Sequence, residues 1–369
     1  MMNKLMIGFV ALGLLLSACG QTANETDVEV DESVDTVHAE ETVENGVFQP
    51  HEGLNQEPVP LEIERDGKDV YVKMTSQVTD IEIAPGEIYK AWTFNGEAPG
   101  PLVVVEEGDT IHFTLENIDP GLPHSMDFHA VHTAPDKGFA DVAPNEEGTF
   151  VYEANSPGVF MYHCGTEPVL SHIANGMHGV IIVKPKDGYP TDDEVDREFV
   201  IIQNEWYKYN DLDDMTNGVP SQVVFSSKEF EDGGQPNTNG TTTALKDEPL
   251  QAKAGEKIRF YINNVGPNEV SSFHVIGTIM EDVYMDGHPA NHLEGMQTIM
   301  LPASGGAVGE FVVKERGTYS FVTHQFNHAT KGAVGVIEQI QLLRKSIIRL
   351  LGFPEFVMTQ TMFYVAMRL

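Results

Sequence analysis

The chain has 369 residues, with 56 acidic against 22 basic side chains and a formal net charge of −34. This length suits about two domains, and a charge of this sign argues against nucleic-acid binding through the phosphates. Glycine (34) and proline (21) are abundant and 41% of the residues are apolar, which favours an all-β fold of short strands and many turns.

The first 56 residues read as export and tethering segments. Lys4 precedes an apolar run, 5–16, that is too short to span a bilayer. The run ends in LSACG, which resembles the lipobox of bacterial lipoproteins and implies cleavage before Cys19 and a lipid on its sulfur. We therefore expect a signal segment at 1–19, an acidic disordered tether at 20–56, and a protein exported to the outer face of the bacterial cytoplasmic membrane, held there by its lipid anchor alone.

From about residue 58 the pattern indicates strands, and the second half of the chain repeats the first. GDTIHFTLEN at 108–117 is echoed by GEKIRFYINN at 255–264, and PGVFMYHC at 157–164 by RGTYSFVTH at 316–324. Such a repeat predicts two copies of one β-sandwich. The basic and apolar stretch 340–369 fits neither copy.

A group of potential metal ligands lies at the end of the first copy. His163 and Cys164 are adjacent, and His172 and Met177 follow closely. Because successive side chains of a strand point to opposite faces, the adjacent pair is expected to bind two different metals. One Cys, two His and a weak axial Met describe a blue-copper electron-transfer site, for which His124 is the candidate fourth ligand. The alternative is a buried free cysteine among ordinary neighbours.

A second set of histidines faces the other way. His129 lies five residues after His124, an odd spacing that places the two on opposite faces of an extended segment, so His129 can join His163 on the outside. A third ligand must come from another domain or subunit, and His324 is favoured over His328. Three imidazoles with one open position make a catalytic metal site, and a ring of subunits would close such a head-to-tail contact.

Residues 58–338 resemble the copper-containing nitrite reductases, a family of two-domain cupredoxin homotrimers. The resemblance is most specific in HSMDFHA, FMYHCGTEPVLSHIANGMHG, SSFHVIG and VTHQFNHA. It implies two tandem cupredoxin-like Greek-key β-sandwiches, at 57–187 and 195–339. It also implies one type 1 and one type 2 copper per subunit, with the following residues in these roles: type 1 ligands His124, Cys164, His172 and Met177; type 2 ligands His129 and His163 with His324 of the adjacent subunit; catalytic Asp127 and His274.

The function that this resemblance implies is the dissimilatory one-electron reduction of nitrite to nitric oxide and water, with a cytochrome c or a small cupredoxin as the electron donor. The chain departs from many family members in a loop between Cys164 and His172 that is one residue shorter, and in the tail 340–369. Two alternatives remain. A two-domain multicopper oxidase would need His-X-His pairs, which the sequence lacks; a non-catalytic lipid-anchored cupredoxin would need the type 1 ligands alone.

Overall fold

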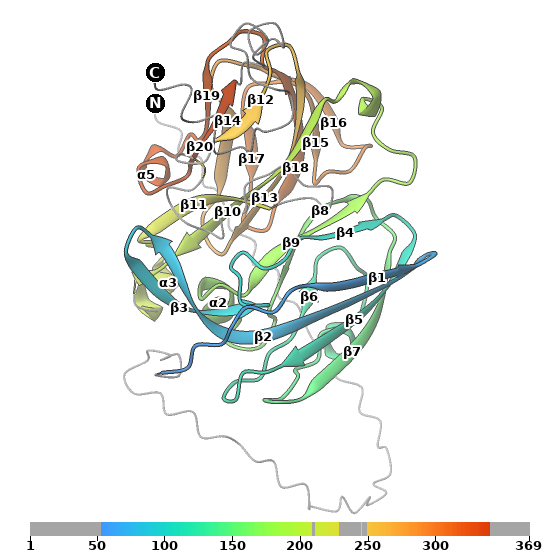
Figure 1. Ribbon diagram of the computed structural model, residues 1–369, viewed down its shortest axis with the longest axis vertical. Helices are drawn as coiled ribbons and strands as arrows, with labels where there is room; N and C mark the ends of the chain where they lie inside the picture. The colour runs from blue at the N-terminus through green and yellow to red at the C-terminus, as the bar shows by residue number, and fades with distance from the viewer. Residues whose placement is uncertain (1–52, 209–210, 229–244, 246–248, 340–369) are drawn as a thin grey trace, which may run out of the picture. The chain divides into compact units, whose positions relative to one another are not determined.

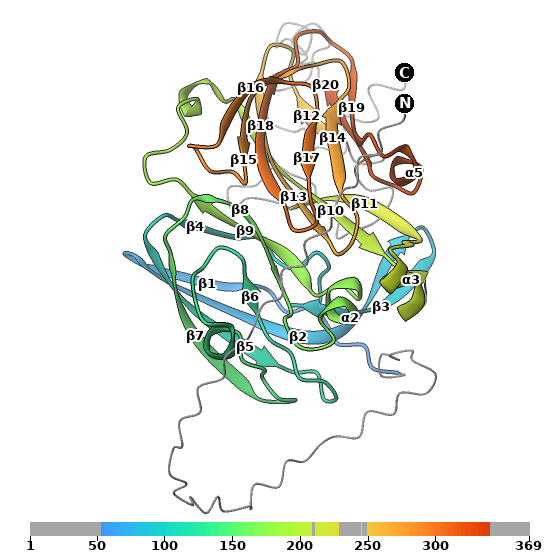
Figure 2. The ribbon, with the colours of Figure 1, turned by 180° about the vertical axis from the view of Figure 1, so that it is seen from behind.

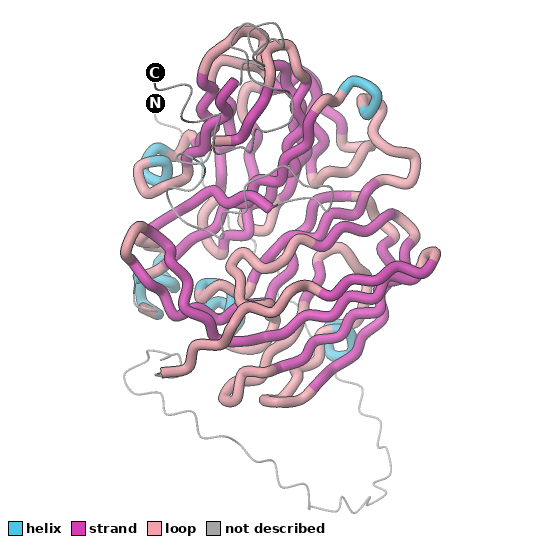
Figure 3. The backbone as a smooth tube through the Cα atoms, in the orientation of Figure 1, coloured by secondary structure: helices cyan, strands magenta, loops and turns pink. Residues whose placement is uncertain are grey.

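The computed structural model describes residues 53–208, 211–228, 245 and 249–339. All of them belong to one compact unit, and their regular secondary structure is almost wholly strand (Figure 3). The signal segment with Cys19, nearly all of the acidic tether and the tail 340–369 lie outside the described residues, so the predictions made for them stay predictions.

The first half of the chain forms two facing sheets (Figure 1). One sheet has the order β1-β2-β5-β7, with β3 paired to β2, and the other has the order β4-β9-β8-β6. The strand bounds are β1 Glu62–Asp66, β2 Asp69–Ala84, β3 Glu87–Phe94, β4 Val103–Glu106, β5 Asp109–Asn117, β6 Asp127–Phe128, β7 Glu147–Ala154, β8 Gly158–His163 and β9 His178–Lys184.

The second half forms another such pair (Figure 2), with the orders β11-β10-β13-β18-β15-β16 and β12-β20-β19-β14-β17. The strand bounds are β10 Arg197–Trp206, β11 Gln222–Lys228, β12 Leu250–Ala252, β13 Lys257–Gly266, β14 Ser271–Val275, β15 Met280–Met285, β16 His292–Met296, β17 Ile299–Leu301, β18 Gly306–Val312, β19 Thr318–Thr323 and β20 Val334–Gln339.

The strand pairings bear out the internal repeat. β5 lies between a parallel neighbour, β2, and an antiparallel one, β7; its counterpart β13 lies in the same way between β10 and β18. Likewise β8 pairs with β9 and β6, and its counterpart β19 pairs with β20 and β14. The two echoes read from the sequence therefore fold into equivalent central strands of two equivalent sandwiches.

Alternation of apolar and polar residues builds each core. Along β5, Ile111, Phe113 and Leu115 are fully buried, while the residues between them are half-buried, as expected of a strand with one face inward. Phe113 meets Phe128 of the opposite sheet edge to face, with ring centroids 5.1 Å apart. Burial of each such ring contributes about 2–3 kcal/mol, so this core holds β6, and with it the segment of His124 to His129, in place.

The two sandwiches share a third apolar cluster that includes Val159 and Val180 of the first and Val200 and Val308 of the second. The Asn263 amide donates to the Val159 carbonyl at 3.2 Å across this contact. The Val159 backbone amide also donates to the Asp286 carbonyl at 2.8 Å, so backbone approaches backbone closely where β8, the strand that ends at His163, packs on the second sandwich. The position of β8 is fixed from both sides.

Four short α-helices and a 3₁₀ turn lie within the described ranges. Their bounds are α1 Pro135–Gly138, α2 Val169–Ala174, α3 Leu212–Asn217, α5 Phe326–Ala329 and η1 Asp192–Glu194. None of the helices in the described part of the chain has the length and hydropathy needed to cross a membrane. The sequence reading did not foresee these helices, because none is long enough to repeat an apolar period.

Candidate metal centres

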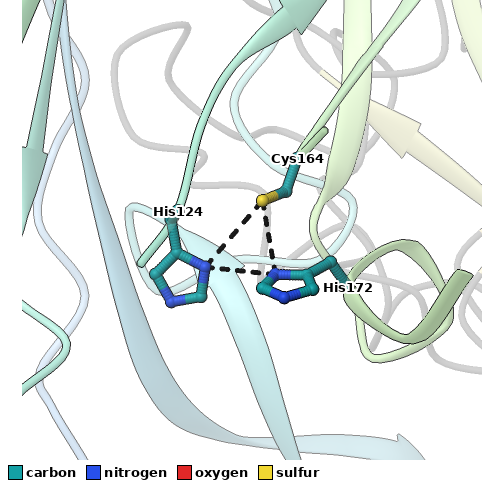
Figure 4. Close-up of side chains that lie close together, drawn as sticks. All are labelled: His124, Cys164 and His172. Atoms are coloured by element: carbon teal, nitrogen blue, oxygen red, sulfur yellow. Dashed lines mark hydrogen bonds between the residues drawn. The ribbon is translucent and has the colours of Figure 1, made fainter. Parts of the chain in front are cut away.

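A buried cluster of one thiol and two imidazoles lies at the end of β8 (Figure 4). Cys164 Sγ is 3.3 Å from His172 Nδ1 and 3.9 Å from His124 Nδ1, and the two nitrogens are 3.3 Å apart. All three side chains are at most 2% exposed. The sequence analysis predicted that these three residues share one metal site, and the structure brings their side chains together.

Each ligand of this cluster comes from a different local structure. Cys164 follows directly on β8, His172 lies on α2, and His124 is held by an isolated bridge to Val142. Met177 is fully buried beside them: its carbonyl accepts from the Cys164 amide at 3.1 Å and its amide donates to the His172 carbonyl at 3.1 Å. The backbone therefore ties Met177 to two members of the cluster.

A buried carboxylate sets the orientation of His124. Asp119 Oδ2 lies 3.1 Å from His124 Nε2, and both side chains are fully buried. A proton on Nε2 leaves the lone pair of Nδ1 directed at the cluster. Burial lowers the pKa of His124, but its hydrogen bonds to Asp119 and Cys164 outweigh burial and raise the pKa above its usual value.

The surroundings of Cys164 favour deprotonation of its thiol. Burial raises the pKa of Cys164, but the hydrogen bond and charge of His124 outweigh this effect, with further hydrogen bonds from Thr166 and the Ser125 amide, so the pKa lies below its usual value. A low thiol pKa favours the thiolate, which is the form that binds metals. Two imidazole lone pairs and a thiolate within 4.8 Å of one another fit a copper ion.

A second cluster lies on the outer side of the same strand end. His129 Nε2 is 3.0 Å from His163 Nε2, and Asp127 Oδ2 is 3.8 Å from His163 Nε2. Burial and the neighbouring His163 lower the pKa of His129, against the opposing charge of Asp127. Two imidazoles on a partly exposed surface, with a carboxylate beside them, can hold a metal and leave room for further ligands.

One residue joins the two clusters. The Cys164 side chain lies in the first, while its carbonyl oxygen accepts from His163 Nδ1 at 2.8 Å. This bond directs the lone pair of His163 Nε2 toward His129. The expected opposite orientation of His163 and Cys164 is therefore found. The segment from His124 to His129 also presents its two histidines to different clusters, although only Asp127–Phe128 within it is regular strand.

The remaining predicted site residues lie together on the second sandwich. His274 of β14 and His324, just after β19, have ring centroids 5.2 Å apart. His274 donates from Nδ1 to the Gln297 carbonyl. Among the described residues, His324 belongs to neither ligand cluster of the first sandwich. His324 is exposed, whereas His328 is buried with its Nε2 3.5 Å from Glu269.

Some residues around the clusters escaped the sequence reading. Asp119, Asp141 and Thr166 lie in loops, and nothing in their sequence context distinguishes them from ordinary turn residues. A third group, Asp282, His292 and Glu294 on β15 and β16, is mostly exposed, and Lys257 already neutralises Asp282 with Nζ 3.0 Å from its carboxylate.

Two tandem sandwiches of this strand order, with a cysteine sulfur and two imidazoles buried at the end of one of them, define a copper protein of the cupredoxin class. The model of the multicopper oxidase family matches residues 75–188. The chain is 39% identical to the copper-containing nitrite reductase of Neisseria meningitidis serogroup A over 76% of its own length and 72% of that relative.

Solved structures agree with this comparison. The copper nitrite reductase from Nitrosomonas europaea matches with a TM-score of 0.67 and 38% identity, over 74% of this chain and 94% of that one. The enzyme from Thermus scotoductus matches with a TM-score of 0.66 and 35% identity, over 73% and 61% of the two chains. The chain belongs to the family of copper-containing nitrite reductases, and the predicted all-β cupredoxin-like fold is confirmed.

Proposed function

We propose that this chain is a dissimilatory nitrite reductase that converts nitrite to nitric oxide and water, with one type 1 and one type 2 copper per subunit. The observation that carries the proposal is the double role of Cys164, whose thiol lies in one cluster while its carbonyl orients His163 of the other. An electron received at the first cluster has a short covalent path to the second. Membership of the family supports the substrate.

For the type 1 copper we assign four ligands, His124, Cys164, His172 and Met177. The bound copper supplies a one-electron acceptor and donor. The protein contributes a site shielded from solvent, since each of the four side chains is at most 2% exposed, and a lone pair on His124 Nδ1 that Asp119 orients. A rigid, buried ligand set of this composition suits electron transfer, because little has to move when the charge changes.

For the type 2 copper we assign His129 and His163 of one subunit and His324 of an adjacent one in a homotrimer. The exposure of His324 supports this assignment. So does the exposed Phe326, whose ring lies edge to face against that of His324 with centroids 5.1 Å apart, since exposed apolar surface beside a polar group suits an interface.

The shared site has a sharp test by subunit mixing. His129→Ala and His324→Ala should each abolish nitrite reduction when present in every subunit. After unfolding and random reassembly of the two variants in equal amounts, about one quarter of the interfaces should combine an intact His129 with an intact His324. Nitrite reduction should return to about the same fraction of its value in the unchanged protein. A double variant carrying both changes in one chain is the control that cannot regain activity. No recovery on mixing would refute a site shared between subunits.

Two side chains are assigned to proton delivery. Reduction of nitrite consumes one electron and two protons, breaks one N–O bond and releases water. Asp127, 30% exposed and beside His163, is placed to donate a proton to the departing oxygen. His274, with Nδ1 bonded to the Gln297 carbonyl, keeps Nε2 for the substrate side and supplies the second proton, directly or through water. General acid catalysis of this kind contributes about 10²–10⁴-fold.

Asp127→Asn is the variant that tests this chemistry. It should leave both coppers bound and lower the turnover of nitrite by about 10²-fold or more. Asp136→Asn, a change of another exposed carboxylate nearby in sequence, is the matched control and should leave turnover unchanged. Nitric oxide release and copper content are measured together. Normal turnover of the copper-loaded Asp127→Asn protein would remove Asp127 from the reaction.

The electron donor is proposed to be a cytochrome c or a small cupredoxin with a basic docking patch, on the outer face of the cytoplasmic membrane where a lipid on Cys19 anchors the enzyme. Helix α2, which carries His172, packs on α3, whose first turn carries Asp213 and Asp214. Acidic groups beside the electron entry point suit a basic partner. Turnover with such a donor should fall as ionic strength rises.

An electron carrier without catalysis is the second candidate, favoured by one observation. The described part of a single chain brings only two imidazoles together at the outer cluster. Copper content separates the two functions, since a carrier binds one copper per subunit and a reductase two. Reduction of oxygen by a multicopper oxidase is less supported, because the sequence has no His-X-His pair.

A further inference from the structure

The internal repeat extends from the strands to the loops at their ends. HIANGMHG at 172–179 is echoed by HATKGAVG at 328–335. Each segment begins within a short helix, α2 or α5, and runs into the next strand, β9 or β20. Gly176 and Gly332 stand at the same position of the two segments, with φ values of 116° and 125°, a conformation that favours glycine. The two loops therefore follow the same path.

Backbone hydrogen bonds to these loops align Thr323 of the second sandwich with Cys164 of the first. Met177 and Ala333 are the sixth residues of the two segments. The Cys164 amide donates to the Met177 carbonyl at 3.1 Å, and the Thr323 amide donates to the Ala333 carbonyl at 3.3 Å. Both the thiol and the hydroxyl side chain are fully buried. A hydroxyl is not the soft ligand that a blue-copper site needs, so Thr323 has this position without that role.

The Thr323 hydroxyl keeps another contact that the thiol makes in the first sandwich. There, the Ser125 amide donates to Cys164 Sγ at 3.4 Å. In the second sandwich the Ser272 amide donates to Thr323 Oγ1 at 3.0 Å, which is the usual length of a good N–H···O bond. Oxygen is a better acceptor than sulfur. The hydroxyl therefore ties the end of β19 to β14 firmly.

This contact lies between two residues assigned to the reaction. The Ser272 carbonyl accepts from the His324 amide at 2.8 Å, so Ser272 is bonded to both Thr323 and the residue after it. His274 lies two residues beyond Ser272 on β14, and alternate residues of a strand project from the same face. The rings of His274 and His324 have centroids 5.2 Å apart. The bond from Ser272 to Thr323 therefore joins the two backbone segments that carry these histidines.

We propose that Thr323 is a positioning residue of the type 2 site, whose buried hydroxyl holds the Ser272 amide and thereby sets the position of His324 relative to His274. The proposal rests on the assignment of His324 to the type 2 copper made above. Valine has nearly the shape of threonine but no hydroxyl, so Thr323→Val deprives the Ser272 amide of its acceptor. An amide in this situation gains a new partner only if the segments move apart and admit water. His324 is next to the contact and moves with it.

The test compares copper affinities of variants of the full chain. Thr323→Val should lower the affinity for type 2 copper about 10-fold and leave the affinity for type 1 copper unchanged. Thr323→Ser keeps the hydroxyl and should bind type 2 copper as the unchanged protein does. Thr79→Val is the matched control, because Thr79 of β2 is also buried and its hydroxyl donates to the Gln56 carbonyl at 3.2 Å. No ligand is assigned to β2, so neither affinity should change.

Competition with a chelator, followed by electron paramagnetic resonance, measures both affinities in one sample, because the two copper types give separate signals. Equal type 2 affinities of Thr323→Val and the unchanged protein would overturn the proposal. So would equal losses in Thr323→Ser and Thr323→Val, because the hydroxyl would then not be responsible. A parallel fall of both affinities in Thr323→Val would overturn it too, since general loss of stability would explain the result. If the unchanged protein gave no type 2 signal, the proposed function itself would fail, and the proposal with it.

Discussion

The orientation of His124 by a buried carboxylate gives the sharpest prediction for a single atom change. In Asp119→Asn the side chain keeps its shape. In the unchanged protein one carboxylate oxygen faces His124 Nε2 at 3.1 Å, and the other accepts from the Gly121 and Leu122 amides at 2.8 and 3.4 Å. An amide cannot satisfy both sides, because one of its two ends is a donor.

The expected loss of copper affinity follows from this geometry. If the amide oxygen stays on the backbone amides, the NH₂ group faces His124 Nε2. This favours the ring with its proton on Nδ1, the atom that we propose binds copper. Loss of such an outer partner typically lowers metal affinity about 10–100-fold, which is about 1.4–2.7 kcal/mol at about 1.36 kcal/mol per tenfold change. The second cluster contains neither Asp119 nor His124, so its copper affinity should not change.

Competition with a chelator, followed by the absorption of the type 1 copper, measures the affinity. Asp69→Asn is the matched control, because Asp69 also bonds a histidine, with Oδ1 2.7 Å from His112 Nε2, but at a half-exposed position. It should leave both copper affinities unchanged. If Asp119→Asn bound type 1 copper as tightly as the unchanged protein, the role of this carboxylate in presetting His124 would be refuted.

Three further results are expected. Burial raises the pKa of Asp109, but the Glu106 amide and Arg65 outweigh it and hold the pKa low. The stability from this carboxylate is therefore present above its usual pKa and lost as the pH falls through the lower folded value. Asp109→Asn should destabilise the protein at pH 7 and flatten the fall of the unfolding free energy in acid; an unchanged acid limb would contradict this. Gly306→Ala drives a methyl group into the Val159 carbonyl oxygen and should lower the free energy of unfolding by about 1–3 kcal/mol in a denaturant titration. Gly317→Ala, whose methyl meets nothing within 4 Å, is the control and should show no measurable change. Equal effects of the two changes would contradict a tight contact between the sandwiches. Removal of copper by a chelator should lower the midpoint temperature of thermal unfolding, since copper binds the folded state. An identical midpoint with and without copper would mean that copper does not stabilise the folded protein.

The clusters of the first sandwich were predictable because they depend on local geometry. His163 and Cys164 are neighbours at the end of an extended strand, so their opposite orientations follow from the period of a strand. The odd spacing of His124 and His129 predicted their opposite orientations for the same reason, although the regular strand between them is only two residues long. The internal echo of β5 in β13 likewise required only the comparison of two short patterns.

The supporting contacts were beyond the sequence because they join distant loops. The bond from Thr166 to Asp141 spans 25 residues and that from His274 to the carbonyl of Gln297 spans 23, and each depends on how two loops close over a sandwich. No periodic pattern encodes such a contact. The role proposed for His324 involves a second copy of the chain; the internal repeat made this residue the candidate, and the family resemblance implied the same assignment.

Electron paramagnetic resonance of the copper-loaded protein, with and without nitrite, decides whether there are two coppers and whether nitrite binds at the outer one. We expect two signals of similar intensity, one with narrow and one with broad hyperfine splitting, of which only the broad signal shifts when nitrite is added. A type 1 signal alone in a fully loaded sample would contradict the proposed function, and the protein would then be an electron carrier.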